Sequence, residues 1–216
     1  GSGRRAENAE GIAKQWRLLG GVPVIRWSVS RLIAAGADPV VVVVGADDRS
    51  RLDQALQGLE GWQTITGGAT RFESVQAGLK ALGDLPPERP VLIHDSARPL
   101  IDAEIIERVL SALDRGSDGA LPALAVRDTL KSATENRVQA TVDRTSLWMA
   151  QTPQAFRLGR LRLAVAAWDA SVTPTDDAAV LEADGGVVTL VAGYAKLLKL
   201  TYSEDFAILE AMMASP

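Results

Sequence analysis

The sequence predicts an α/β protein built on a mostly parallel sheet with helices on both of its faces. Two short, continuously apolar runs, residues 39–45 and 91–93, are typical of strands that are buried on both faces of such a sheet. Segments with apolar residues at helical spacing separate the predicted strands, so strands and helices alternate along the chain. This alternation implies right-handed crossovers between parallel strands.

The composition is that of an ordinary globular protein. The chain has 216 residues, of which 47% are hydrophobic and 23% charged, and it carries a net charge of -4, which argues against a nucleic-acid partner. It contains no cysteine, so disulfides and thiol catalysis are excluded. No apolar run is long enough to span a bilayer, and no signal-peptide pattern opens the chain. We therefore expect a soluble cytoplasmic protein without membrane or nucleic-acid partners.

The helices of the first half are predicted from apolar residues three or four positions apart. The strands among them are residues 39–45, a weaker candidate at 62–66, and 91–93. Asp47 and Asp48 are expected to cap the second helix and Asp102 the fourth. In chain order, the apolar faces are Ile25, Val29, Leu32 and Ile33; Leu52, Leu56 and Leu59; Val75, Leu79 and Leu82; and Ile105, Ile106, Val109 and Leu113.

Two loops at strand ends are candidate ligand sites. Gly67-Gly68 leads into the helix that begins near Arg71, where outward N–H groups could bind an anion; an ordinary tight turn is the alternative. His94-Asp95 ends the strand 91–93, and ligands of open α/β sheets bind at the carboxyl ends of strands. Asp95 is placed to hold Mg²⁺ and Arg98 to face a phosphate, unless Asp95 merely caps the following turn.

The second half of the chain departs from simple alternation. After a strand at 119–126, two extended stretches at 128–131 and 138–142 predict a hairpin arm over about 127–146. Its strands lack a long apolar face, so we expect the arm to pack on a second copy of the chain; a solvated excursion is the alternative. Further elements are a helix through Leu161, a helix capped at 175–177, strands at 187–191 and 196–201, and a final helix. We expect residues 1–216 to form one domain with an arm.

Several reaction classes are disfavoured by what the sequence lacks. His94 is the only histidine, so a histidine-rich metal site is impossible and a structural role for this residue is favoured over catalysis. Neither a Gly-x-Ser-x-Gly elbow nor a P-loop is present. What remains is a strand-end carboxylate and a set of dispersed cations, an inventory that suits phosphoryl or nucleotidyl transfer. The cations are Arg5, Lys14, Arg71, Arg98 and Lys199.

The start of the chain allows two interpretations. Gly1-Ser2-Gly3 is either a remnant of cloning or the end of a glycine-rich phosphate loop, in which Arg4 and Arg5 would supply positive charge. In the second interpretation, the strand that precedes such a loop is missing before residue 1.

Taken together, the motifs resemble those of the 2-C-methyl-D-erythritol 4-phosphate cytidylyltransferase family over essentially the whole chain. The blocks His94-Asp95-Ser96-Ala97-Arg98-Pro99 and Gln151-Thr152-Pro153-Gln154 are specific. The supporting blocks are Gly1-Ser2-Gly3-Arg4-Arg5, Ala13-Lys14-Gln15-Trp16, Gly67-Gly68-Ala69 with Arg71, Asp128-Thr129-Leu130-Lys131, Asp143-Arg144, Thr175-Asp176 and Lys199-Leu200-Thr201. The resemblance implies a Rossmann-like nucleotidyltransferase fold and a reaction that joins CTP to methylerythritol phosphate and releases pyrophosphate, in non-mevalonate isoprenoid biosynthesis.

The resemblance also implies a role for each matched residue. Catalytic roles fall to Arg5 and Lys14, which would neutralise the triphosphate, and to Lys199, which would stabilise charge during attack. Asp95 would hold Mg²⁺ on the α-phosphate. Gly1, Ser2, Gly3, Gly68, Ala69, Arg71, Ser74 and Ser96 would bind CTP, with Gly68, Ala69, Arg71 and Ser74 around the cytosine and ribose. Arg98, Thr129, Arg144 and Thr152 would contact methylerythritol phosphate, with the arm of a second subunit closing that site.

Some residues depart from the family pattern. Ala13 and Trp16 replace a proline and a tyrosine, and Asp177 replaces a glutamate. Ser96 stands where alanine is common, and Leu197 stands at a position often held by asparagine, next to Lys199 in the motif. The family's first strand would precede Gly1.

Two other functions, and the question of a fused domain, stay open at this point. A ribitol 5-phosphate cytidylyltransferase would share the CTP site and differ around Thr129, Arg144 and Thr152. A catalytically silent nucleotide-binding scaffold would keep the fold for assembly, although Lys14, Asp95, Arg98 and Lys199 together favour an enzyme. In some relatives the next domain is the cyclodiphosphate synthase of the same pathway, so the chain could be one half of a bifunctional enzyme.

Overall fold

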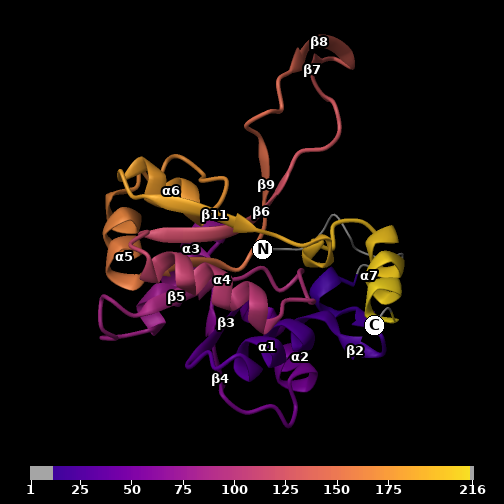
Figure 1. Ribbon diagram of the computed structural model, residues 1–216. Coiled ribbons are helices and arrows are strands. Elements are labelled where there is room, and N and C mark those ends of the chain that lie inside the picture. The colour runs from indigo at the N-terminus through magenta and orange to yellow at the C-terminus, as the bar shows by residue number, and fades with distance from the viewer. Residues whose placement is uncertain (1–11, 215–216) are drawn as a thin grey trace.

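The central sheet contains strands β5 (Pro90–Ile93), β6 (Gly119–Ala125), β9 (Trp148–Ala150), β10 (Gln154–Arg157) and β11 (Val188–Ala192). The structure is a computed structural model that describes residues 12–214 (Figure 1). The strands pair in the order β11–β6–β10–β5, and β9 pairs with the end of β6 beyond β10. β11 runs parallel to β6, whereas β10 is antiparallel to both of its neighbours. The predicted α/β fold is confirmed, but the sheet is mixed because the chain returning from the arm inserts as β10.

Helices cover both faces of this sheet, as expected. Because side chains alternate along a strand, Ala120 and Ala155 pack with α4, whereas Leu121 and Phe156, the next residues along, pack with α5 and α6. The helices are α1 (Val24–Ala34), α2 (Arg49–Ala55), α3 (Arg71–Ala81), α4 (Ala103–Asp114), α5 (Leu158–Ala167), α6 (Asp177–Ala183) and α7 (Glu204–Ala214). None of these helices is long and apolar enough to cross a membrane.

A second, two-stranded sheet is formed by β3 (Val40–Val44) and β4 (Trp62–Thr66), which run parallel. Both strands lie where the sequence predicts them. Within residues 12–214, β3 pairs with β4 alone, and β5 pairs with β10 alone. The residues of β5 after Pro90 are half-buried, so the expectation of a strand buried on both faces is wrong for the structure as described. The reason is a cavity between β3 and β5, which is described below.

Side-chain caps explain where several helices begin. The Asp102 carboxylate accepts a hydrogen bond from the N–H of Ile105 at 3.0 Å and caps α4, as predicted. Thr70 and Glu73 form a reciprocal capping box at the start of α3. The predicted cap of α2 is wrong, because the Asp48 side chain makes no capping bond and lies 3.9 Å from Arg51 instead.

The predicted hairpin arm is confirmed. It consists of β7 (Leu130–Thr134) and β8 (Arg137–Val142), which pair antiparallel and stand away from the body of the protein (Figure 1). Glu135 and Asn136 join them with φ of 49° and 64°, the left-handed geometry that tight hairpins favour. Every residue of β8 is exposed.

The segment 196–201 is not a strand, contrary to the prediction. Its first residues belong to a 3-10 helix, Ala195–Leu197, and Leu200 donates one backbone hydrogen bond to the Ala97 carbonyl at 2.9 Å. Leu197 and Leu200 are fully buried, so apolar side chains anchor this segment without a strand ladder. The segment passes the end of β5, which brings Lys199 to the site described next.

Candidate active site

Asp95 lies just beyond the carboxyl end of β5, with two cations beside it. One carboxylate oxygen is 2.6 Å from the Nζ of Lys199, and the other is 3.9 Å from the Nε of Arg71. The Asp95 side chain is 19% exposed, so solvent and small ions reach it. Three residues predicted to share a nucleotide site therefore meet, although they come from the segment 196–201, the loop after β5 and the start of α3.

The surroundings of Asp95 keep it ionised. Burial disfavours its charged form, but the positive charges of Lys199, Arg71 and Arg98 outweigh burial and lower the pKa of Asp95 below its usual value. At neutral pH this side chain is a carboxylate within a cationic setting. Such a setting can receive a polyanion whose charge the cations offset.

Arg71 is held in place by Asp177, the first residue of α6. Its two terminal nitrogens bind the two carboxylate oxygens, with Nη1 at 2.9 Å from Oδ1 and Nη2 bonded to Oδ2. Asp177 is 2% exposed. Burial works against the charge on Arg71, yet Asp177 and Asp95 raise the pKa of Arg71. Sequence reasoning did not predict that Asp177 pairs with Arg71. One signal could have indicated it: the side chain of Asp176 caps α6, so the adjacent carboxylate of Asp177 is free to bind another residue.

In the Gly67-Gly68 loop, a side chain of the protein occupies two of the backbone N–H groups. The Glu73 carboxylate accepts hydrogen bonds from the N–H groups of Ala69, at 2.6 Å, and Thr70, at 3.2 Å. A Cβ on Gly68 would lie 2.2 Å from the Cβ of Glu73, so glycine is required for this close approach. The protein's own carboxylate therefore takes two of the N–H groups of this loop, and an anion site at the first N–H groups of α3 stays a prediction. That Gly68 and Ala69 contact the cytosine base stays a prediction.

His94 and Thr152 fix the backbone of Asp95. The Thr152 hydroxyl accepts from the Asp95 N–H at 3.1 Å and lies 3.0 Å from the His94 Nδ1. Because the His94 Nε2 donates to the Arg98 carbonyl at 3.0 Å, Nδ1 accepts the Thr152 proton. Burial lowers the pKa of His94 to about 4, so the ring is neutral at pH 7. The Thr152 hydroxyl is thus engaged within the protein, and its predicted contact with substrate stays a prediction.

Two of the predicted cations also bond to the backbone. Arg98 donates from Nη1 to the Leu197 carbonyl at 2.5 Å and from Nη2 to the Ala150 carbonyl at 3.4 Å. Lys14 donates from Nζ to the Leu200 carbonyl at 2.6 Å. Both side chains thus bond their own segments to the segment 196–201, which carries Lys199. Lys14 thereby lies at the same end of the molecule as Asp95.

The remaining predicted residues have different surroundings. The Ser74 hydroxyl donates to the Thr70 carbonyl at 2.9 Å, and the Ser96 carbonyl accepts from the Ser28 hydroxyl at 2.9 Å. Thr129 and Arg144 are exposed at the base of the arm, and within residues 12–214 no hydrogen bond or ion pair joins either to Asp95. Gly1, Ser2, Gly3 and Arg5 lie outside the described residues.

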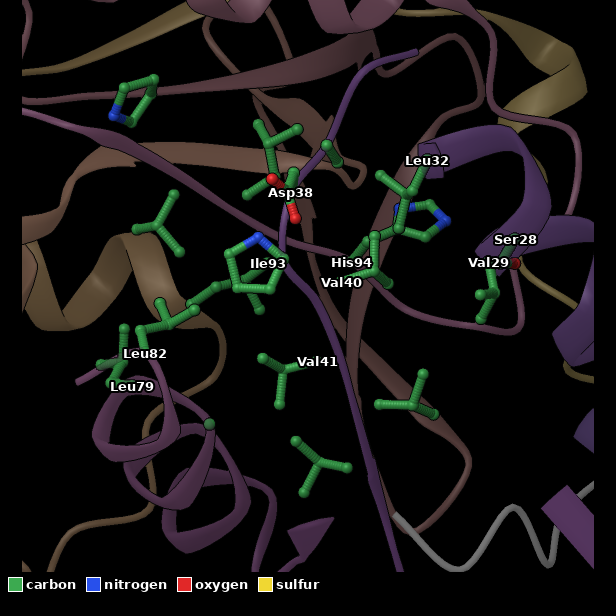
Figure 2. Close-up of a pocket in the computed structure, with 18 of the residues that line it drawn as sticks. Ser28, Val29, Leu32, Asp38, Val40, Val41, Leu79, Leu82, Ile93 and His94 are labelled. Carbon is green, nitrogen blue, oxygen red and sulfur yellow. The ribbon is translucent and has the colours of Figure 1, made fainter. Parts of the chain in front are cut away.

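A cavity of about 640 Å³ opens beside Asp95. Arg71, Ser74, Asp95 and Ser96 lie among its lining residues, which are otherwise mostly apolar. Figure 2 shows this apolar part, with Val41 of β3, Ile93 of β5, Leu79 of α3 and Val29 of α1 around the space. The polar site is therefore one edge of a larger apolar space.

The residues around Asp95 fit a magnesium ion bound together with a phosphate ligand. Within residues 12–214, no group of three or more histidine, aspartate or glutamate side chains forms a metal cage. Mg²⁺ is commonly held by one or two carboxylates, with substrate phosphates and water completing its six ligands. A single ionised carboxylate such as Asp95 suits that arrangement.

Comparison with known proteins shows the family to which the chain belongs. A family model described as IspD, 2-C-methyl-D-erythritol 4-phosphate cytidylyltransferase, matches residues 1–215. The bifunctional enzyme IspD/IspF of Caulobacter vibrioides (strain NA1000 / CB15N) is 54% identical over 210 residues, which are 97% of this chain and 54% of that protein. The chain thus spans about half the length of the curated relatives it matches.

Solved structures share the fold over nearly the whole chain. A crystal structure of 4-diphosphocytidyl-2C-methyl-D-erythritol synthase superposes with a TM-score of 0.84 at 33% identity, covering 93% of this chain and 94% of that one. The bifunctional IspDF of Campylobacter jejuni gives a TM-score of 0.76 at 28% identity, covering 92% of this chain and 49% of that one. The fold class predicted from the sequence is confirmed by these neighbours.

Proposed function

Because the chain belongs to the 2-C-methyl-D-erythritol 4-phosphate cytidylyltransferase family, we propose that it joins CTP to 2-C-methyl-D-erythritol 4-phosphate. The products are 4-diphosphocytidyl-2-C-methyl-D-erythritol and pyrophosphate, formed in the cytoplasm for non-mevalonate isoprenoid biosynthesis. The observation that carries this proposal is the ionised Asp95 carboxylate at the end of β5, with Lys199 and Arg71 beside it.

The reaction is an in-line displacement between two anions. A phosphate oxygen of methylerythritol phosphate attacks the α-phosphorus of CTP, the bond from that phosphorus to the bridging oxygen breaks, and pyrophosphate leaves with the electron pair. A phosphate monoester has its second pKa near 6, so the attacking oxygen is ionised at pH 7 and needs no general base. A neutral His94 bonded within the protein agrees with such a mechanism.

The side chains near Asp95 hold and neutralise the triphosphate in this proposal. Asp95 would hold Mg²⁺, which when bound withdraws charge from the α-phosphate. Lys199, at 42% exposure, is accessible for an ion pair with the phosphate oxygens that gain charge. Arg71 is oriented by Asp177 toward the same site. Lys14 and Arg5 are assigned to the triphosphate, and Gly1 to Gly3 to the loop around it.

Methylerythritol phosphate is assigned to the space between the strand-end site and the arm. Thr129 and Arg144 are exposed at the base of the arm, where an anionic substrate can reach them. We assign the opposite wall of this subsite to Arg98 and Thr152, with Thr152 acting through the backbone of Asp95.

A second copy of the chain is proposed to complete the site. The arm and the strand β9 at its base expose large apolar side chains, among them Val138 at 63% and Trp148 at 51%. Exposed apolar side chains on a two-stranded hairpin gain most by packing against a partner. We therefore propose a homodimer in which each arm reaches the other subunit.

The test of the reaction is pyrophosphate release from CTP and Mg²⁺ with either methylerythritol phosphate or ribitol 5-phosphate. We expect release with methylerythritol phosphate, and a fall in kcat of about 100-fold or more for Asp95→Asn, because the isosteric amide loses the charge that holds the metal. Asp53→Asn is the matched control, since Asp53 is an exposed residue paired with Arg49. An unchanged kcat in Asp95→Asn would contradict the proposed site.

The two alternative functions give different results in this test. Release with ribitol 5-phosphate alone would keep the CTP site and identify a pentitol phosphate cytidylyltransferase. Binding of CTP without release from either substrate, in protein that is folded by circular dichroism, would identify a nucleotide-binding scaffold.

A fused partner domain is proposed from the relatives. The curated relatives are bifunctional enzymes of about twice this length, and the Campylobacter jejuni structure bears the same description. We propose that this domain also works beside a cyclodiphosphate synthase of the same pathway. That synthase would act on a compound formed from the product of this domain.

A further inference from the structure

Residues 151–154, which we call the 151–154 block, lead from β9 into β10 beside the end of β5. All four residues are buried, and Gln151 and Gln154 are only 5% and 1% exposed. Thr152 bonds to the backbone of Asp95, as described above. The two glutamines have no role in the reaction as proposed so far, yet each buries a side-chain amide close to the site.

Gln151 binds the backbone of the segment that leads to Lys199. Its Nε2 donates to the Tyr194 carbonyl at 2.8 Å, and its Oε1 accepts from the Tyr194 N–H at 3.2 Å. Tyr194 precedes the 3-10 helix Ala195–Leu197, and Lys199 is the second residue after that helix. A Cβ on Gly193 would lie 2.3 Å from the Oε1 of Gln151, so glycine leaves room for the amide. The amide thus fixes the start of the segment that carries Lys199.

Gln154 binds the start of α6, next to the partner of Arg71. Its Nε2 donates to the Oδ2 of Asp176 at 2.8 Å, and its Oε1 accepts from the Ala178 N–H at 3.1 Å. These two residues flank Asp177, whose carboxylate holds the guanidinium of Arg71. Gln154 therefore fixes the backbone on both sides of Asp177.

The chemistry of the two amides indicates that they supply orientation more than stability. A glutamine amide has a donor and an acceptor in one plane, and each of these amides uses both on a target distant in sequence. A buried hydrogen bond adds little net stability, because the same groups bond to water in the unfolded chain. An apolar side chain of similar length would fill either position but would set no orientation.

We propose that Gln151 and Gln154 are positioning residues, which hold Lys199 and Arg71 at the two carboxylate oxygens of Asp95. Gln151 acts through the backbone of residues 194–199, and Gln154 acts through Asp177. Misplacing a group at a reacting centre by about 1 Å can cost about 100-fold in rate. The kinetic consequence rests on the proposed function, whereas the order of the two cations can be measured without the reaction.

The two glutamines are expected to differ in the size of their effect. The segment with Lys199 is also held by Arg98, which donates to the Leu197 carbonyl at 2.5 Å, and by the Leu200 N–H, which donates to Ala97. At the start of α6, Gln154 and Arg71 supply the hydrogen bonds that reach residues 176–178 from other elements of the described chain. Loss of Gln154 should therefore be the more harmful.

The first test reads the two cations in the free protein, after one amide has been replaced by an apolar chain of similar length. The readout is the NMR order parameter of the Arg71 Nε and Lys199 Nζ groups, from 15N relaxation. We expect Gln154→Met to lower the order parameter of Arg71 alone, to below about 0.6. Gln151→Met should lower that of Lys199 alone, by a smaller amount. Gln63→Met, at an exposed position of β4, is the matched control and should change neither.

The second test is kcat for pyrophosphate release in double-mutant cycles. Gln154→Met should lower kcat about 10-fold, but less than about 2-fold in an Arg71→Met background, where no guanidinium is left to position. In a Lys199→Met background the 10-fold loss should persist. Gln151→Met should lower kcat about 3-fold, and only in chains that retain Lys199.

A further variant keeps the proposal testable if Gln154→Met fails to fold, which circular dichroism would show. Asp176→Asn retains an oxygen for the cap of α6 but sets an NH₂ group against the Nε2 of Gln154. We expect it to lower the order parameter of Arg71 and to leave that of Lys199 unchanged.

Three results would overturn the proposal. The first is unchanged order parameters of both cations in the folded glutamine variants. The second is an equal loss of order at Arg71 and Lys199 in either variant, which would show general loosening of the protein. The third is a fall in kcat of the same size with and without the cation concerned. A wild type that releases no pyrophosphate would instead refute the proposed function, and the paired NMR changes would still establish the positioning role.

Discussion

Around Asp95, polar side chains are held by partners in the body of the protein, whereas along β8 every residue is exposed. Lys199, Arg71 and Thr152 each bond to a segment distant in sequence, so no single element sets the geometry of the site. The arm depends on one local turn and one two-stranded ladder. In the proposed function, the site must offset charge at one point and needs fixed groups, whereas the arm would meet a second subunit and needs exposed ones.

The strongest test of this contrast is Lys199→Met, which removes the cation nearest to Asp95. We expect kcat for pyrophosphate release to fall by about 100- to 1,000-fold, because a fixed charge near the reacting phosphate is lost. Lys196→Met is the control, since Lys196 pairs with Asp102 at 2.5 Å and not with Asp95. Equal losses in both variants would show that general destabilisation of this segment, and not the charge of Lys199, sets the rate.

The internal bonds of His94 predict a pH dependence of stability. The unfolded chain binds a proton on this residue near pH 6.5, but the folded protein does so only at about 4. The free energy of unfolding should therefore be fully retained above 6.5 and fall by about 3 kcal/mol as the pH drops to about 4. Urea unfolding of the wild type and of His94→Gln measures this, and equal slopes between pH 6.5 and 4 would contradict it.

The contribution of Asp95 falls in a lower pH window. Its folded pKa is lowered from 3.8, so the stability it adds is present above that value and is lost only as the pH falls further. Acid unfolding should therefore show the loss due to His94 first, and Asp95→Asn should lack the further loss below pH 3.8.

The buried pair of Arg71 and Asp177 should matter for stability more than an exposed pair. We expect Asp177→Asn to lower the free energy of unfolding by about 2 kcal/mol, less than for a fully buried pair because Arg71 is 36% exposed. Asp53→Asn, which breaks the exposed pair with Arg49, should cost at most about 0.5 kcal/mol. Urea unfolding compares the two variants, and similar losses would show that the Asp177 pair adds no more than a surface pair.

The smallest effect on stability is expected in the arm. Val138→Asp should change the free energy of unfolding by less than about 0.5 kcal/mol in dilute protein, because the side chain is already exposed. It should weaken self-association, which sedimentation velocity measures. Leu163→Asp on α5 is a matched control, since both positions are 63% exposed. Equal dimerisation of Val138→Asp and the wild type would remove the arm from the proposed interface.

Local patterns account for most of the elements that the sequence predicted correctly. The valine run of β3, the cap Asp102 and the hairpin of the arm depend on neighbours in the chain, so their residues suffice to indicate them. Antiparallel β10 was missed, because its pairing partners β5 and β6 lie far away in sequence. The segment 196–201 was predicted as a strand for a similar reason. Its apolar residues are buried by tertiary contacts and form no ladder with a neighbouring strand.

For the site, the sequence by itself determined which residues to propose: a carboxylate after an apolar strand, and cations in motifs that match a known family. Only the tertiary structure decided what those residues do to one another. It showed that Asp177 orients Arg71, that Glu73 occupies the N–H groups of the Gly67-Gly68 loop, and that the Thr152 hydroxyl is engaged within the protein. The physical reason is that a hydrogen bond or ion pair depends on distance in space, which spacing along the chain determines only within a helix, a turn or a hairpin.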